Sequence, residues 1–142
     1  MGVLMKNLLF ASLVSLVVSQ HAISSNSIMV IANTQDASIE PTRQEIRNLF
    51  MGSVLSYDLK AITLPPENRA RVLFNTKVVG LTESRIQSYW AQMRFSGRKT
   101  QPKELASEVL VIEYLQTHPG TVSYVSADAE IPNDLTILFQ IN

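Results

Sequence analysis

Hydrophobic and polar residues alternate along this chain in short blocks, and the spacing changes between strand-like and helix-like. Residues 27–34 form an apolar run rich in β-branched side chains that ends in a polar turn, which predicts a buried strand. The next block, residues 41–52, is typical of a short amphipathic helix. Its apolar residues Ile46, Leu49 and Phe50 lie at i, i+3 and i+4. The folded part of the chain therefore begins with a strand and a helix.

The middle of the chain continues with a second strand and two helices. Residues 59–66 alternate loosely and end in two prolines, which predicts a strand leading directly into a helix. That helix starts after Asn68, a good N-cap, and ends at Gly80. Its apolar stripe is expected to comprise Val72, Leu73, Thr76 and Val79. A third helix starts at Thr82, and its buried face is expected to comprise Ile86, Tyr89, Trp90 and Met93.

One more helix and two strands complete the pattern. Residues 103–120 predict a helix that ends at His118-Pro119-Gly120. Its stripe is expected to comprise Leu105, Val109, Ile112 and Leu115. Residues 121–127 and 134–141 are apolar strands separated by a polar turn. The order β-α-β-α-α-α-β-β, without a repeat or linker, favours a single α/β domain with a mixed sheet flanked by helices.

The N-terminus has a different character. Lys6 precedes an apolar run over residues 8–19, which is typical of a secretory signal peptide and too short to span a membrane. Small residues allow cleavage after Ser19, Ala22 or Ser25, with an uncleaved anchor as the alternative. We therefore expect a signal peptide over residues 1–22 and export to the periplasm or the medium, with no membrane span after cleavage.

Composition narrows the classes of function. Removing the signal leaves about 120 residues, enough for one hydrophobic core. The 12 cationic and 12 acidic side chains balance, so the overall charge favours neither nucleic acid nor an anionic membrane as a partner. Because the chain has no cysteine, disulfides, thiolate nucleophiles and Cys-bound metals are excluded.

Catalytic and metal-binding patterns are absent from the sequence. Its two histidines are His21, in or beside the signal, and His118, which reads as a helix-end residue. Phosphate-loop, dinucleotide-binding, nucleophile-elbow and zinc-protease motifs do not occur. We therefore expect no enzyme activity, no cofactor and no metal.

Two groups of cations are the candidate binding residues. One surrounds Gly97 in a predicted helix-to-helix connection and comprises Arg94, Arg98, Lys99 and Lys103. The other comprises Arg69 and Arg71, which follow Asn68 at a predicted helix start, where unpaired backbone N–H groups favour anions. The alternative for both groups is ordinary solvated surface charge.

Four stretches in this order resemble the substrate-binding proteins of phosphate ABC transporters, and in particular their short, single-lobe members. They are "LFMG" at residues 49–52, "RVLFNTKVVG" at 71–80, "YWAQMRFSGRKTQPKE" at 89–104 and "HPGTVSYVS" at 118–126. The resemblance covers residues 27–142 and implies a single lobe of the periplasmic-binding-protein type. The cations around Gly97 then lie in the loop between two helices of that lobe.

The resemblance implies phosphate or another small oxyanion as the ligand, with Asn68, Arg69 and Arg71 as the candidate ligand-binding residues. The chain departs from the family here, because "PPENRARVLF" lacks the Ser-Gly-Thr run that meets the oxyanion and Glu67 adds a repelling carboxylate. We therefore expect weak anion binding at most. The alternative is a protein–protein interaction module in the cell envelope that keeps the scaffold and docks a second copy or another envelope protein.

Overall fold

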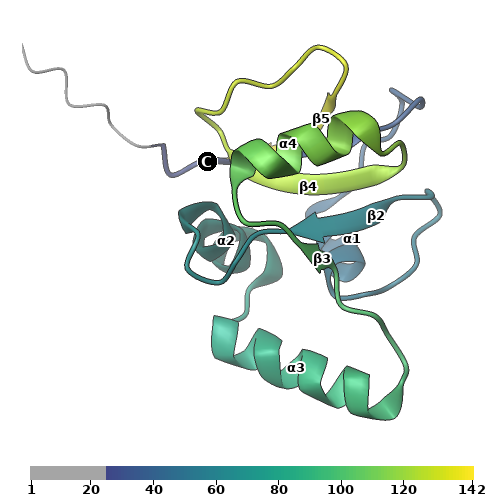
Figure 1. Ribbon diagram of the computed structural model, residues 1–142, viewed down its shortest axis with the longest axis vertical. Helices are drawn as coiled ribbons and strands as arrows, with labels where there is room; N and C mark the ends of the chain where they lie inside the picture. Colours follow the sequence, from purple (N-terminus) through teal and green to yellow (C-terminus); the bar gives the residue numbers. More distant parts are fainter. Residues whose placement is uncertain (1–24) are drawn as a thin grey trace, which may run out of the picture.

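The computed structural model describes residues 25–142, and the expected signal peptide lies outside them. In chain order the elements are β1 (Ile28–Asn33), α1 (Arg43–Phe50), β2 (Lys60–Thr63), α2 (Arg69–Phe74), the π-helical turn η1 (Asn75–Val79), α3 (Glu83–Ser96), β3 (Lys103–Glu104), α4 (Glu108–Thr117), β4 (Thr121–Ser126) and β5 (Thr136–Ile141). Figure 1 shows their arrangement. Among these residues no helix is both long and apolar enough to cross a membrane.

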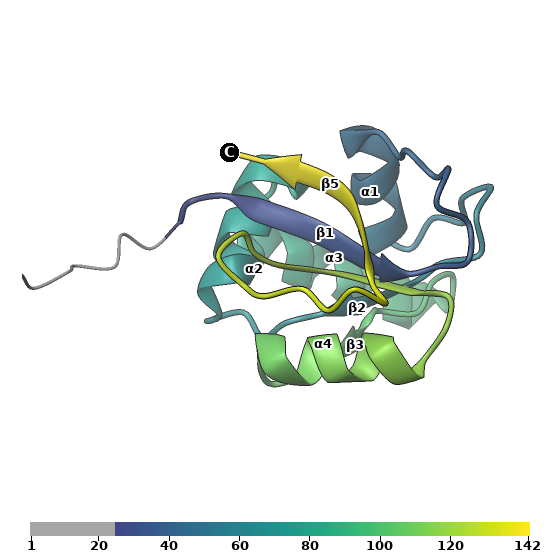
Figure 2. The ribbon, with the colours of Figure 1, turned by 90° about the horizontal axis from the view of Figure 1, so that it is seen from above.

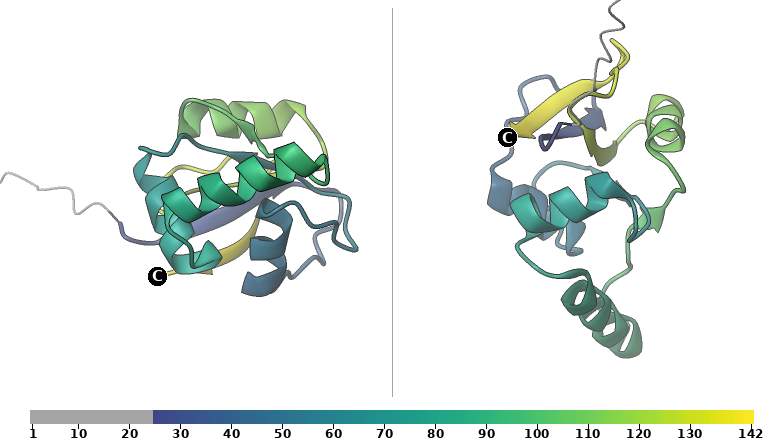
Figure 3. Two further views of the ribbon diagram at one scale, coloured as in Figure 1. Left: turned by 90° about the horizontal axis from the view of Figure 1, so that it is seen from below. Right: turned by 90° about the vertical axis from the view of Figure 1, so that its left-hand side faces the viewer.

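A five-stranded mixed sheet in the order β3-β2-β4-β1-β5 organises the domain. Strand β1 pairs antiparallel with β4 and β5, whereas β2 pairs parallel with β4 and β3. Helix α4 covers one face of the sheet, and α1 and α2 cover the other (Figures 2 and 3). Helix α3 lies apart from these layers, beyond the β3 edge (Figure 1). The predicted α/β class with a mixed sheet is confirmed.

The core lies on both faces of the central strands. Residues 28–32 of β1 are all buried, as a strand between two helical layers requires. Three aromatic rings fill the space under α1 and α2: Phe74 stacks on Tyr124 with ring centroids 4.0 Å apart, and Phe50 meets Phe74 edge-on at 4.7 Å. This cluster fixes α2 over the carboxyl end of β2.

Gly52 explains how α3 is held against the body. Its φ of +87° lies in the left-handed region, and a β-carbon there would approach the Trp90 ring to 2.9 Å. The Tyr89 hydroxyl also donates a hydrogen bond of 2.7 Å to the Met51 carbonyl. The "LFMG" and "YW" stretches noted in the sequence are therefore in contact in the fold.

Two expected apolar stripes are partly wrong. In the second helix Val79 is buried and Leu73 packs against the core as expected, but Val72 and Thr76 are exposed. The buried face also comprises Ala70, Arg71, Phe74, Asn75 and Val78. The last helix starts at Glu108 and not at Lys103, because residues 103–104 pair with β2 as strand β3 and Ser107 caps the helix. Val109 is consequently 65% exposed, while Val111 and Leu115 face the core.

Candidate functional site

The start of α2, where sequence predicts anion ligands, uses its polar groups internally. The Asn68 side-chain oxygen accepts a 2.8 Å hydrogen bond from the Ala70 backbone N–H and so caps the helix. Arg69 is exposed and donates to the side-chain oxygen of Asn26, just before β1. Arg71 points the other way, into the protein. The structure therefore does not bring the three predicted residues together around one concave site.

Arg71 is buried, with only 3% of its surface exposed, because it lies on the core face of α2. Its Nε and Nη2 donate to the two carboxylate oxygens of Glu83 at 2.9 and 2.5 Å. Its Nη1 donates to the Leu64 carbonyl at 2.6 Å and lies 3.4 Å from a carboxylate oxygen of Glu104. Each guanidinium nitrogen thus has an acceptor within the chain.

Glu83, at the start of α3, gathers further donors. Its carboxylate accepts 2.7 Å hydrogen bonds from the side-chain amides of Asn75 and Gln87. Burial raises the pKa of Glu83, but the hydrogen bonds from Arg71, Gln87 and Asn75 together with the charge of Arg71 outweigh burial and hold this pKa below its ordinary value. The carboxylate of Glu83 therefore stays ionised and takes a forked guanidinium contact of the kind an oxyanion would take.

The charge of this cluster disfavours an added anion. One guanidinium, Arg71, is shared by two carboxylates, Glu83 and Glu104, so the three side chains sum to one negative charge. The partly exposed side chain of Glu104 lies 3.4 Å from the buried Arg71 guanidinium and would repel a phosphate placed beside it. Coulomb repulsion at such short range is several times stronger near a protein surface than in bulk water.

A small pocket adjoins the buried cluster. Its polar wall comprises Thr63, Arg71, Asn75 and Tyr124, and its apolar wall includes Phe50, Phe74 and Trp90. The free volume is about 30 Å³, enough for one or two water molecules. The Tyr124 hydroxyl lies 2.7 Å from the Thr63 hydroxyl, and burial raises the pKa of Tyr124 to about 12, so it stays neutral. The polar groups of this wall are already paired with one another or with Glu83.

Sequence reasoning singled out Arg71 but missed its partners. The sequence places Glu83 near a helix start and Glu104 on a solvated helix surface beside Glu108, and it does not single out Asn75. One signal was available: Arg71 precedes Phe74, Asn75 and Val78 at i+3, i+4 and i+7, which places it on the same helical face. An arginine on a core face requires a carboxylate partner.

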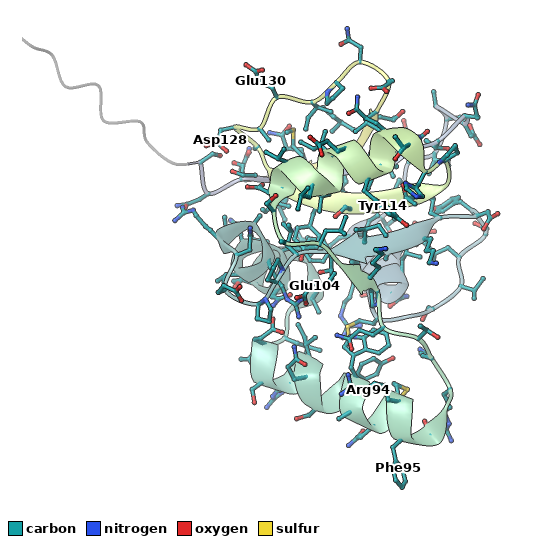
Figure 4. The ribbon with its side chains drawn as sticks, viewed as in Figure 1. Arg94, Phe95, Glu104, Tyr114, Asp128 and Glu130 are labelled. Atoms are coloured by element: carbon teal, nitrogen blue, oxygen red, sulfur yellow. The ribbon has the colours of Figure 1, made fainter. Side chains whose placement is uncertain are left out.

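The second group of cations lies on and beyond the C-terminal end of α3 (Figure 4). Arg94 donates to the Gln101 side chain at 3.0 Å, and Lys99 donates to the Tyr89 hydroxyl at 3.1 Å. Lys103 sits 5.1 Å from the centre of the Tyr114 ring of α4. Arg98 is exposed. Within residues 25–142 no group of three or more histidine, aspartate or glutamate side chains is placed to hold a metal.

No protein-family model matches this sequence, and no curated protein is significantly similar to it. A similar fold occurs in the crystal structure of an ABC-type phosphate transport receptor from Vibrio cholerae, with a TM-score of 0.57 and 11% sequence identity. The match covers 80% of this chain and 47% of the receptor, so the chain spans about half the length of that protein. The predicted fold, a single lobe of the periplasmic-binding-protein type, is thereby confirmed.

Proposed function

We propose that this chain is an exported, non-enzymatic domain of the cell envelope that keeps one receptor lobe as a scaffold and uses it to bind a protein partner. The observation that carries the proposal is the state of Arg71. This buried arginine is one of the three predicted anion ligands, and it is already paired with Glu83 and Glu104. A lobe in which a carboxylate of the same chain already pairs with this guanidinium is better suited to serve as a rigid scaffold than to bind and release a solute.

Phosphate or another small oxyanion, bound at Asn68, Arg69 and Arg71, is the second candidate ligand. The phosphate receptor with the same fold and the exposed guanidinium of Arg69 support it. Binding there would depend on Arg69 and on the backbone N–H groups of a six-residue helix, since Arg71 is engaged elsewhere. We expect such binding to be weak and strongly salt-dependent.

Isothermal titration of the exported protein with sodium phosphate at low ionic strength separates these two functions. We expect no saturable heat from the wild-type chain. The informative variant is Glu83→Gln/Glu104→Gln, which keeps the size of both side chains but frees the Arg71 guanidinium from both charges. Saturable phosphate binding by the wild type that disappears in Arg69→Ala would reject the partner proposal and establish the oxyanion site.

Export is tested separately. Mass spectrometry of the protein recovered from a periplasmic extract of the native host should show a chain that begins after Ser19, Ala22 or Ser25. Recovery of the full-length chain from the membrane fraction would instead support an uncleaved anchor.

A further inference from the structure

The charges of this nearly neutral chain are separated along its sequence. Residues 84–103 contain five of the 12 lysines and arginines and no carboxylate. Residues 104–142 contain six of the 12 carboxylates and no lysine or arginine. The first segment is mostly α3, and the second includes α4 and the C-terminal strands. Local charge therefore matters more for docking than the net charge.

The basic surface is the C-terminal end of α3, defined by Arg94, Phe95 and Arg98. All three side chains are exposed, and Phe95 is 97% exposed. Figure 4 shows Phe95 projecting from the end of the molecule opposite the loop between β4 and β5, which carries Glu130. A fully exposed phenylalanine between two arginines is typical of an anchor that fills a pocket on a partner, with charges around it.

The acidic surface lies on α4 and the neighbouring loop, and is defined by Val109, Leu110, Glu113, Glu130 and Asp134. Val109 and Leu110 are 65% and 45% exposed, and Glu113 lies one helical turn further on the same side. The Gln116 side chain donates to Asp134 at 3.1 Å, which holds the loop beside α4. This surface thus combines an exposed apolar spot with carboxylates.

We infer that these two surfaces bind each other in different copies of the chain, with Phe95 of one copy packed on Val109 and Leu110 of the next. Arg94 and Arg98 would then face Glu113 and Glu130. The surfaces lie toward opposite ends of the long axis (Figure 4), so one molecule offers both at once. Contacts between two different surfaces are heterologous and extend into chains unless the rotation closes a ring.

Charge complementarity favours a second copy over an anionic membrane. A bilayer would attract the basic surface but repel the carboxylates, and the balanced total charge adds no attraction. This inference rests on the proposed function, since it names the partner that the scaffold binds. Beyond the proposed function, the inference specifies which two surfaces are in contact and that the contact is heterologous.

Sedimentation velocity over a range of protein concentrations tests the inference. We expect species larger than a dimer at low salt and about a tenfold weaker association at 1 M salt. Variant B, Arg94→Gln/Phe95→Ser/Arg98→Gln, removes the basic surface, and variant A, Val109→Ser/Glu113→Gln/Glu130→Gln, removes the acidic one, and neither variant creates a new charge that could pair with the other. Each variant alone should be monomeric. Arg43→Glu/Lys60→Glu, which changes two exposed cations elsewhere, should assemble like the wild type.

Because variant A keeps the basic surface and variant B keeps the acidic surface, their mixture should form a one-to-one dimer and grow no further. A wild type that stays monomeric at all concentrations, or a mixture that forms no dimer, would overturn the inference. The phosphate titration, repeated on monomeric variant B, reports on the proposed function independently.

Discussion

At the scale of single residues, the fate of one arginine decides how the lobe can function. Arg71 follows a helix start, where a guanidinium can serve as an anion ligand, yet its position on the core face turns it inward. Once buried, the guanidinium needs carboxylate partners, because an unpaired buried charge is very unfavourable. Glu83 and Glu104 meet this need. The same contacts that stabilise the fold therefore occupy the guanidinium that was predicted to bind an anion.

Replacing Arg71 should destabilise the protein and should not reveal a lost ligand. We expect Arg71→Met to lower the free energy of unfolding by about 2–3 kcal/mol, because Glu83 loses its guanidinium partner while retaining some contact with water. Arg69→Met, at an exposed position, should change it by less than about 0.5 kcal/mol. Urea denaturation of both variants measures the difference. Equal effects would mean that Arg71 is solvated.

Gly52 makes a second residue-scale prediction. In Gly52→Ala the added methyl group meets the Trp90 ring as well as the strained left-handed backbone. We expect a loss of about 2–4 kcal/mol, against about 1–2 kcal/mol for Gly97→Ala, where φ is also positive but no atom lies within 4 Å. Thermal unfolding of the two variants isolates the Trp90 contact. Equal losses would show that α3 does not pack tightly against residue 52.

At the scale of elements, the start of α4 shows where pattern reading fails. The apolar pattern predicts a helix from Lys103, but the Leu105 backbone N–H donates to the Thr63 carbonyl and extends the sheet edge. The helix begins only after Ser107, whose hydroxyl accepts from the Leu110 N–H at 3.2 Å. A tertiary hydrogen bond thus delays the helix by about one turn.

The position of the start of α4 decides whether replacing Ser107 raises or lowers the free energy of unfolding. Ser107→Ala removes an N-cap and should lower the free energy of unfolding by about 1 kcal/mol. If the helix instead ran from Lys103, alanine would lie inside it and would stabilise the protein slightly. Ser88→Ala, at an exposed position within α3, is the matched control and should be neutral or slightly stabilising. Urea denaturation distinguishes the two signs.

Local patterns predicted most of the elements and the fold class, because strand β1, helix α1 and the strands β4 and β5 are set by apolar spacing and turn residues nearby in sequence. The network around Arg71 could not be predicted in the same way. Glu83 and Glu104 lie 12 and 33 residues away, and only the packing of α3 and β3 brings them close. The assignment of Asn68, Arg69 and Arg71 as anion ligands stays a prediction.

At the scale of the whole molecule, the charged surfaces are not arranged along the same direction as the layers of sheet and helices. The sheet and its covering helices form a compact body, while α3 extends beyond the β3 edge (Figure 3). Arg94 on this outlying helix and Glu130 in the loop between β4 and β5 lie toward opposite ends of the longest dimension (Figure 4). A nearly neutral protein can therefore associate electrostatically with copies of itself while it has little overall attraction for other charged surfaces.

The stability of the whole molecule should fall in acid. Four carboxylates, those of Asp36, Glu45, Glu83 and Asp128, have lowered pKa values in the folded state. For Asp36, Glu45 and Asp128 the cause is hydrogen bonding, from Ser38, Thr42 and Ser126 respectively. The unfolded chain then binds more protons than the folded one, so stability increases with pH across this range. Their contribution is complete above the unfolded values and is lost as pH falls through the folded values.

Glu83→Gln isolates one of these contributions. At pH 7 the variant should be less stable than the wild type, because it leaves Arg71 with one carboxylate fewer. As pH falls through 4.5, the ordinary pKa of glutamate, this side chain takes up a proton in the unfolded wild type before it does so in the folded one, and the folded wild type loses the ion pair only as pH falls through the lowered pKa of Glu83. The difference in free energy of unfolding between the two proteins should therefore narrow from pH 5 to pH 3, as measured by urea denaturation at each pH. A difference that stays constant over this range would mean that Glu83 is not the ionised partner of Arg71 and that this carboxylate does not take the place of an anion in the lobe.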